Sequence, residues 1–160
     1  MPKKRKIASI LRRTGLAFLL IAVVSSNTTA ANEFDLQEFH GKVIVLDFWA
    51  SWCVPCSRSF PWMNSMQEKY ADDGLVIIAV NMDSDAADAD RFLQNYPAEF
   101  EVIFDPDGEL AREYDVVAMP SSYVHDRNGE LLERHLGFKV RSQDEYEAIL
   151  IDALQDTQIN

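Results

Sequence analysis

Cysteine is scarce in this sequence, in which Cys53 and Cys56 are the only two among 160 residues. The chain therefore lacks the second pair that a four-cysteine zinc site needs. A disulfide between the two would close a loop too short to constrain the unfolded chain much. Repeats and low-complexity tracts are also missing, and hydrophobic (48%) and charged (26%) residues occur in ordinary proportions. These absences exclude fibrous, disordered and disulfide-framework proteins, and the length suits one domain with a sizeable core.

Acidic residues are missing before Glu33, and all six charged residues of that segment are basic. An apolar run over 16–24 follows the basic start, and small or polar residues occupy 25–31, which is the layout of a secretory signal. We therefore predict a signal peptide over 1–31 and a folded domain over 32–160. An uncleaved membrane anchor is the alternative, but the apolar run has about half of the roughly 20 residues that a spanning helix needs.

The charge of the chain beyond this segment is strongly acidic. Six of the 15 basic residues fall in 1–31, so residues 32–160 carry nine basic and 26 acidic side chains, a net charge of −17. Such a surface repels phosphate backbones, and we expect no nucleic-acid partner.

Short apolar runs separated by turn-forming residues predict alternating strands and helices. We expect strands over 43–48, 75–81, 102–104, 121–125 and 130–136, and helices over 53–70, 86–96, 109–114 and 143–155. Side chains at Asp83, Asp85 and Ser142 are expected to cap helices. This order indicates an α/β protein with a mixed, mainly parallel sheet covered on both faces. Sites in such sheets form beyond the C-terminal ends of strands, where Cys53 falls.

Cys53 and Cys56 stand three positions apart at the expected start of a helix. Unpaired N–H groups and the positive end of the helix dipole lower the pKa of a thiol there, and the thiolate is the reactive form. Pro55 suits the first turn because no N–H is needed at that point. We predict that Cys53 attacks the disulfide of a partner and that Cys56 resolves the mixed disulfide.

A cysteine pair of this spacing also occurs in metal sites. His40, His125 and His135 show no ligand spacing that would complete a zinc site, and we expect no resident metal or cofactor. A copper-binding assembly factor, with His125 or His135 as an added ligand, stays open as an alternative. A disulfide-forming oxidant is a second alternative, because Val54 and Pro55 do not fix the reduction potential. A redox-inactive binding module is disfavoured because both thiols are present.

The segment VLDFWASWCVPC, from Val45 to Cys56, resembles the active-site segment of thioredoxins. The lead-in over 41–43, an added helix and strand over about 86–104, and a proline-containing strand entry over 117–123 resemble the TlpA/ResA branch of exported thioredoxin-like reductases. This resemblance covers roughly 34–154. It implies a thioredoxin fold, with a central mixed β-sheet flanked by helices and with an inserted helix and strand.

The resemblance also implies roles for single residues. Cys53 matches the attacking thiol and Cys56 the resolving thiol, while Pro120 matches a proline that follows a cis peptide and faces the disulfide. Met119 matches the residue that pairs with the backbone of an extended substrate. We expect substrate contacts from Trp52, Val54, Pro55, Met119 and Pro120.

Asp47 is a single acid inside an apolar strand, where burial raises a carboxyl pKa. It matches the buried acid of thioredoxins, and the resemblance implies that it acts as a general base for Cys56. Many members of the TlpA branch instead carry a neutral residue here and use an acid after the second strand, for which Ser84 is the closest match. We favour Asp47 over Asp83 as the proton acceptor.

These features predict a periplasmic enzyme, a thiol–disulfide oxidoreductase that reduces protein disulfides and works as a monomer. Its expected partners are disulfide-bearing client proteins, with apocytochrome c as one candidate, and a membrane thiol–disulfide protein that restores the dithiol. The N-terminal segment would serve as a membrane tether if it is retained.

Overall fold

A computed structural model describes residues 34–156 of the chain. The signal peptide predicted over 1–31 lies outside the described residues and stays a prediction. Within 34–156, no helix combines the length and the apolar character needed to cross a membrane.

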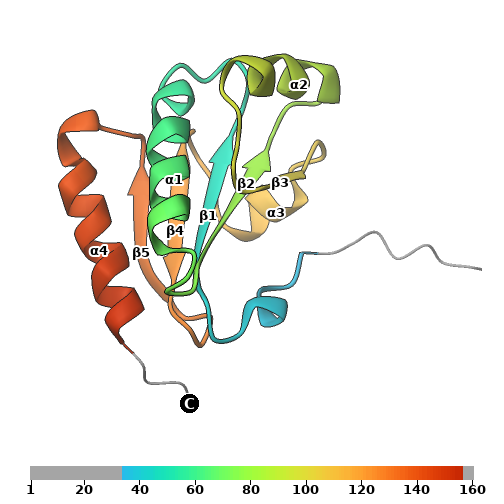
Figure 1. Ribbon diagram of the computed structural model, residues 1–160. Helices are drawn as coiled ribbons and strands as arrows, with labels where there is room; N and C mark the ends of the chain where they lie inside the picture. The colour runs from blue at the N-terminus through green and yellow to red at the C-terminus, as the bar shows by residue number, and fades with distance from the viewer. Residues whose placement is uncertain (1–33, 157–160) are drawn as a thin grey trace, which may run out of the picture. The chain divides into compact units, whose positions relative to one another are not determined.

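Five strands form one mixed sheet in the order β3–β2–β1–β4–β5 (Figure 1). β1 pairs in parallel with β2, and β2 pairs in parallel with β3. β4 is antiparallel to β1, and β5 is antiparallel to β4. The strands are β1 (Val43–Trp49), β2 (Leu75–Asn81), β3 (Glu101–Phe104), β4 (Ser121–His125) and β5 (Leu131–Leu136).

Helices cover both faces of this sheet, because every residue of β1 is buried and needs apolar cover on either side (Figure 1). Side chains of α1, α2 and α4 pack on one face, and those of α3 and the first 3-10 helix pack on the other. The helices are α1 (Cys56–Tyr70), α2 (Ala86–Asn95), α3 (Glu109–Glu113) and α4 (Gln143–Gln155), with 3-10 helices η1 (Leu36–Phe39) and η2 (Val140–Ser142). The predicted α/β architecture is confirmed, including the inserted helix and strand, which are α2 and β3.

Alternation along β1 decides which face each side chain serves. Val45 and Trp49 join the core cluster under α1 and α4, whereas Leu46 and Phe48 join the cluster under α3. Successive strand residues point to opposite faces, so Asp47 lies on the α1 face.

One helix start and one predicted cap differ from the sequence prediction. α1 begins at Cys56 with Pro55 as its N-cap, not at Cys53, because a turn intervenes in which the Cys53 amide donates to the Ala50 carbonyl. Ser142 occupies the N-cap of α4 but makes no side-chain capping bond, since η2 leads directly into this helix. The prediction of a capping bond at Asp85 is confirmed.

Candidate active site

The two cysteines form a disulfide just beyond the C-terminal end of β1, with their Cα atoms 5.3 Å apart. Cys56 is the first residue of α1, and its backbone N–H donates a hydrogen bond of 3.3 Å to Cys53 Sγ. An amide at the positive end of a helix therefore points at this sulfur. Such an amide stabilises negative charge on Cys53 when the disulfide is reduced.

The two cysteines differ in accessibility. Cys53 is 4% exposed, whereas Cys56 is completely buried. Cys53 nevertheless has little solvent-exposed surface for a nucleophile, because its bond to Cys56 holds it against the core cluster. Its neighbours Trp52 (68% exposed) and Val54 (64% exposed) project into solvent on either side. A partner approaching Cys53 would therefore meet these two apolar side chains first.

The segment that leads into β4 has the backbone conformation implied by the resemblance. The Met119–Pro120 peptide is cis. Pro120 is buried, and its carbonyl accepts a hydrogen bond from Gly137 N–H, while the half-buried Met119 packs against the cluster that contains both cysteines. Pro55, also half-buried, lies at the N-cap of α1. The predicted substrate contacts of these residues remain predictions.

Asp47 is completely buried, and burial raises its pKa to about 7 although a hydrogen bond from Ser122 lowers it. Ser122 Oγ donates to Asp47 Oδ1 at 2.5 Å, and no residue within 34–156 bonds to Oδ2. A carboxyl with a pKa near neutrality can accept and release a proton under ordinary conditions. Because Asp47 and Cys56 belong to the same side of the sheet, this group remains our candidate base.

Asp83 has a role that the sequence analysis missed. We expected a helix cap, but its carboxylate instead accepts hydrogen bonds from the Ser51 amide (2.8 Å), the Ser51 hydroxyl (2.9 Å) and Asn81 Nδ2 (2.8 Å). These bonds attach the turn that precedes Trp52 and Cys53 to the end of β2. The position of Asp83 just after β2 could have indicated this contact. β1 and β2 are parallel, so their C-terminal ends, and the residues that follow them, meet at one edge of the sheet.

His125 and His135 lie on opposite faces of the sheet. His125 Nδ1 is 3.1 Å from the Gly129 carbonyl, and its ring contacts Tyr114 in the layer under α3, so the sheet separates it from the disulfide. His135 lies on β5 against the ring of Tyr146. In the described part of the chain, no three or more His, Cys, Asp or Glu side chains converge as metal ligands do. The copper alternative stays open for the cysteine pair itself.

A disulfide at a helix start, beyond the first strand of a mixed sheet and with a cis proline before the antiparallel strand, defines a protein of the thioredoxin fold. The chain belongs to the Redoxin family, which matches residues 20–150.

Individual relatives agree with this assignment. The chain is 33% identical over 115 residues to the thiol-disulfide oxidoreductase ResA of Bacillus thuringiensis subsp. konkukian, a match that covers 71% of this chain and 66% of that protein. The match thus spans just under two thirds of that relative. A Chlorobium tepidum structure provisionally named as a thiol:disulfide interchange protein DsbE has 49% identity and a TM-score of 0.73, covering 74% of this chain and 84% of that one.

StoA from Bacillus subtilis has 25% identity and a TM-score of 0.59, covering 68% of this chain and 84% of that one. Together these likenesses confirm the thioredoxin fold and the ResA-type resemblance predicted from the sequence.

Proposed function

We propose that this chain is a periplasmic thiol–disulfide oxidoreductase that reduces disulfide bonds in client proteins. The observation that carries the proposal is the hydrogen bond from the first amide of α1 to Sγ of Cys53, the one cysteine of the pair that keeps any exposure. The names of the ResA and DsbE relatives support the reaction class. The pattern of residues 1–31 supports export.

The reaction needs two exchanges. In the reduced protein the Cys53 thiolate attacks one sulfur of the client disulfide, which forms a mixed disulfide and releases the other client sulfur as a thiolate. Cys56 gives its proton to the Asp47 carboxylate and attacks Cys53 Sγ. This second step releases the remaining client sulfur and leaves the Cys53–Cys56 disulfide. Two electrons have then passed to the client, and a membrane thiol–disulfide protein returns them to the cysteine pair.

The surface around the site suits an extended polypeptide. Trp52, Val54 and Val117 are all largely exposed apolar side chains, the first two beside Cys53 and the third shortly before the cis peptide. Large apolar side chains left exposed on one surface mark sites of protein interaction. The net charge of −17 over residues 32–160 favours basic clients through electrostatic attraction. Apocytochrome c is the client we propose from the ResA-type resemblance.

Substitution of each cysteine tests the reaction. Cys53→Ser should abolish the reduction of insulin, because no thiolate remains to attack. Cys56→Ser should accumulate mixed disulfides with clients, because the resolving thiol is missing. Equal turnover in wild type and Cys53→Ser would overturn the proposal.

The direction of electron flow is tested by the equilibrium potential against glutathione. A reductant should show a value near that of thioredoxin, about −270 mV, whereas a disulfide-forming oxidant would lie near −120 mV. Titration of the reduced protein with Cu(I) addresses the remaining alternative, which predicts stoichiometric binding in place of insulin reduction.

A further inference from the structure

Three polar residues form a row across the sheet. Asp47 of β1 lies directly opposite Ser122 of β4, and Ser122 lies directly opposite His135 of β5. Directly opposed residues point to the same face, with Cβ atoms about 4.5–5.5 Å apart. The row therefore runs from the buried centre of the sheet to its edge strand, on the face that α1 and α4 cover.

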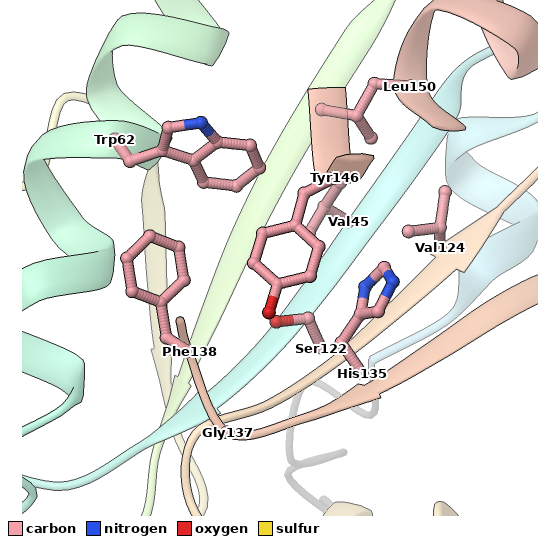
Figure 2. A pocket seen from close by; sticks show the side chains of 9 residues that line it. All are labelled: Val45, Trp62, Ser122, Val124, His135, Gly137, Phe138, Tyr146 and Leu150. Carbon is pink, nitrogen blue, oxygen red and sulfur yellow. The ribbon is translucent and has the colours of Figure 1, made fainter. Parts of the chain in front are cut away.

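A cavity opens along the outer part of this row (Figure 2). Ser122 and His135 line it from the sheet, Tyr146 lines it from α4, and Trp62 lines it from α1. The centre of a water molecule can occupy a volume of about 20 Å³ in this cavity. That space is enough for one water molecule, which needs two to four polar partners. The Ser122 hydroxyl, the His135 ring and the Tyr146 hydroxyl are side chains of the required kind, as Figure 2 shows.

Asp47 has no exposed surface of its own, so a proton that it takes up must leave through neighbouring groups. Its one described hydrogen-bond partner within 34–156 is the Ser122 hydroxyl, which can accept a proton from one side while giving its own to the other. His135 is half-buried, and burial lowers its pKa below the ordinary value. The imidazole is therefore neutral at neutral pH, and a proton that it accepts is released again easily.

We propose that Ser122, one water in this cavity and His135 carry protons between the Asp47 carboxyl and solvent. The proposal rests on the function proposed above, in which Asp47 takes the proton of Cys56. Protonated Asp47 passes its proton to Ser122 Oγ, Ser122 passes its hydroxyl proton to the water, and the water passes one to His135. His135 then releases its proton to solvent, and the carboxylate is restored. No electrons move along the route.

Few other titratable groups face this route. Tyr146 lines the cavity from α4, while Glu133, on β5, raises the pKa of His135 through its charge. A change in the rate of proton release on substitution of His135 can therefore be traced to the imidazole.

The test measures resolution of the mixed disulfide in stopped flow, with a peptide disulfide as client, at low buffer concentration. It is run at about pH 6, where Asp47 is mostly protonated and must release its proton before it can accept that of Cys56. His135→Ala should slow this step by about tenfold, a part of the roughly 10²–10⁴-fold that positioned proton transfer contributes. Free imidazole added at constant ionic strength should restore the rate in proportion to its concentration. Wild type and His40→Ala, which removes an exposed histidine outside the row, should not respond to imidazole.

Ser122 supplies a second variant and a second readout. Ser122→Ala should slow the same step without rescue by imidazole, because the link next to Asp47 is missing, whereas Ser122→Thr should keep the rate. The equilibrium potential of His135→Ala should equal that of wild type, since a proton route changes rates and not equilibria.

The outcomes separate the two proposals. A wild-type protein that exchanges normally while His135→Ala keeps its full rate would overturn the proton route alone. A slow His135→Ala that does not respond to imidazole would also overturn it, because the loss would then be structural. A wild-type protein without exchange would overturn both.

Discussion

Ser122 Oγ donates a hydrogen bond of 2.5 Å to Asp47 Oδ1, between two residues directly opposed on β4 and β1. Burial alone favours the protonated carboxyl, and this hydrogen bond partly offsets that preference. The balance leaves the Asp47 pKa near 7, where the group can serve as base and acid within one cycle. This pair therefore affects both the pH dependence of stability and the proton transfer in the proposed reaction.

Asp47→Asn should stabilise the oxidised protein more at pH 8 than at pH 5. The pKa of Asp47 is raised in the folded state, so the stability that its proton contributes is fully present below about pH 4 and is lost as the pH rises through about 7. Each pH unit in this window is worth about 1.4 kcal/mol. The difference between the gain at pH 8 and the gain at pH 5 should be about 2–3 kcal/mol.

Urea unfolding of both proteins at the two pH values measures this difference. Asp90→Asn, which neutralises an exposed acid on α2, is the matched control and should show no such pH dependence. An equal gain for Asp47→Asn at both pH values would show that the carboxyl ionises normally.

Trp52→Ala should weaken client binding and leave folding unchanged. The side chain is 68% exposed beside Cys53, so its removal takes away contact area for the client and little from the core. Interface tryptophans often contribute more than 1 kcal/mol, and KM for insulin should rise about five- to tenfold. Leu132→Ala removes an exposed leucine from β5 and is the control. Equal KM values in the two variants would contradict a docking role for Trp52.

Asp83→Ala should lower both stability and the rate of exchange. Ser51 would lose a buried acceptor for two hydrogen bonds, which costs about 1–3 kcal/mol, and the turn before Cys53 would no longer be fixed to β2. Asp85→Ala removes a nearby acid that caps α2, and should cost about 1 kcal/mol without slowing exchange. Denaturant titration and single-turnover reduction measure the two effects. A rate for Asp83→Ala equal to that of Asp85→Ala would contradict the positioning role.

The strands and helices were largely predictable because apolar periodicity and turn residues act locally. The turn from Asp105 to Gly108, for example, separates β3 from α3. The start of α1 was not predictable, because the sequence pattern does not show that the Cys53 amide donates a hydrogen bond to the Ala50 carbonyl.

Contacts between distant strands were not predictable either. The buried acid was evident from its place in an apolar run, but its partner lies 75 residues away and depends on the register between β1 and β4. Periodicity predicts which face a residue serves and leaves this register open. The same limit applies to Asp83 and Ser51, which are 32 residues apart. The candidate thiols were thus predictable from the sequence, while the groups that hold and serve them required the fold.

Arg127 bonds to three segments at the end of the sheet opposite the disulfide. Its guanidinium donates hydrogen bonds to the carbonyls of Gly41, Asp73, Leu154 and Asp156. These carbonyls belong to the entry to β1, the turn before β2 and the end of α4. One side chain therefore fixes three chain segments that are far apart in sequence.

Arg127→Ala should lower the free energy of unfolding by about 2–3 kcal/mol, because hydrogen bonds from a charged group contribute more than neutral ones and several carbonyls lose their donor at once. Arg112→Ala is the control: this arginine is exposed and donates to one carbonyl, that of Asp107, so its loss should change stability by about 0.5 kcal/mol or less. Urea titration of the oxidised proteins compares the two. Insulin reduction should survive in Arg127→Ala below its unfolding transition, because the disulfide lies at the other end of β1. Similar small losses in both variants would show that water replaces the guanidinium at these carbonyls.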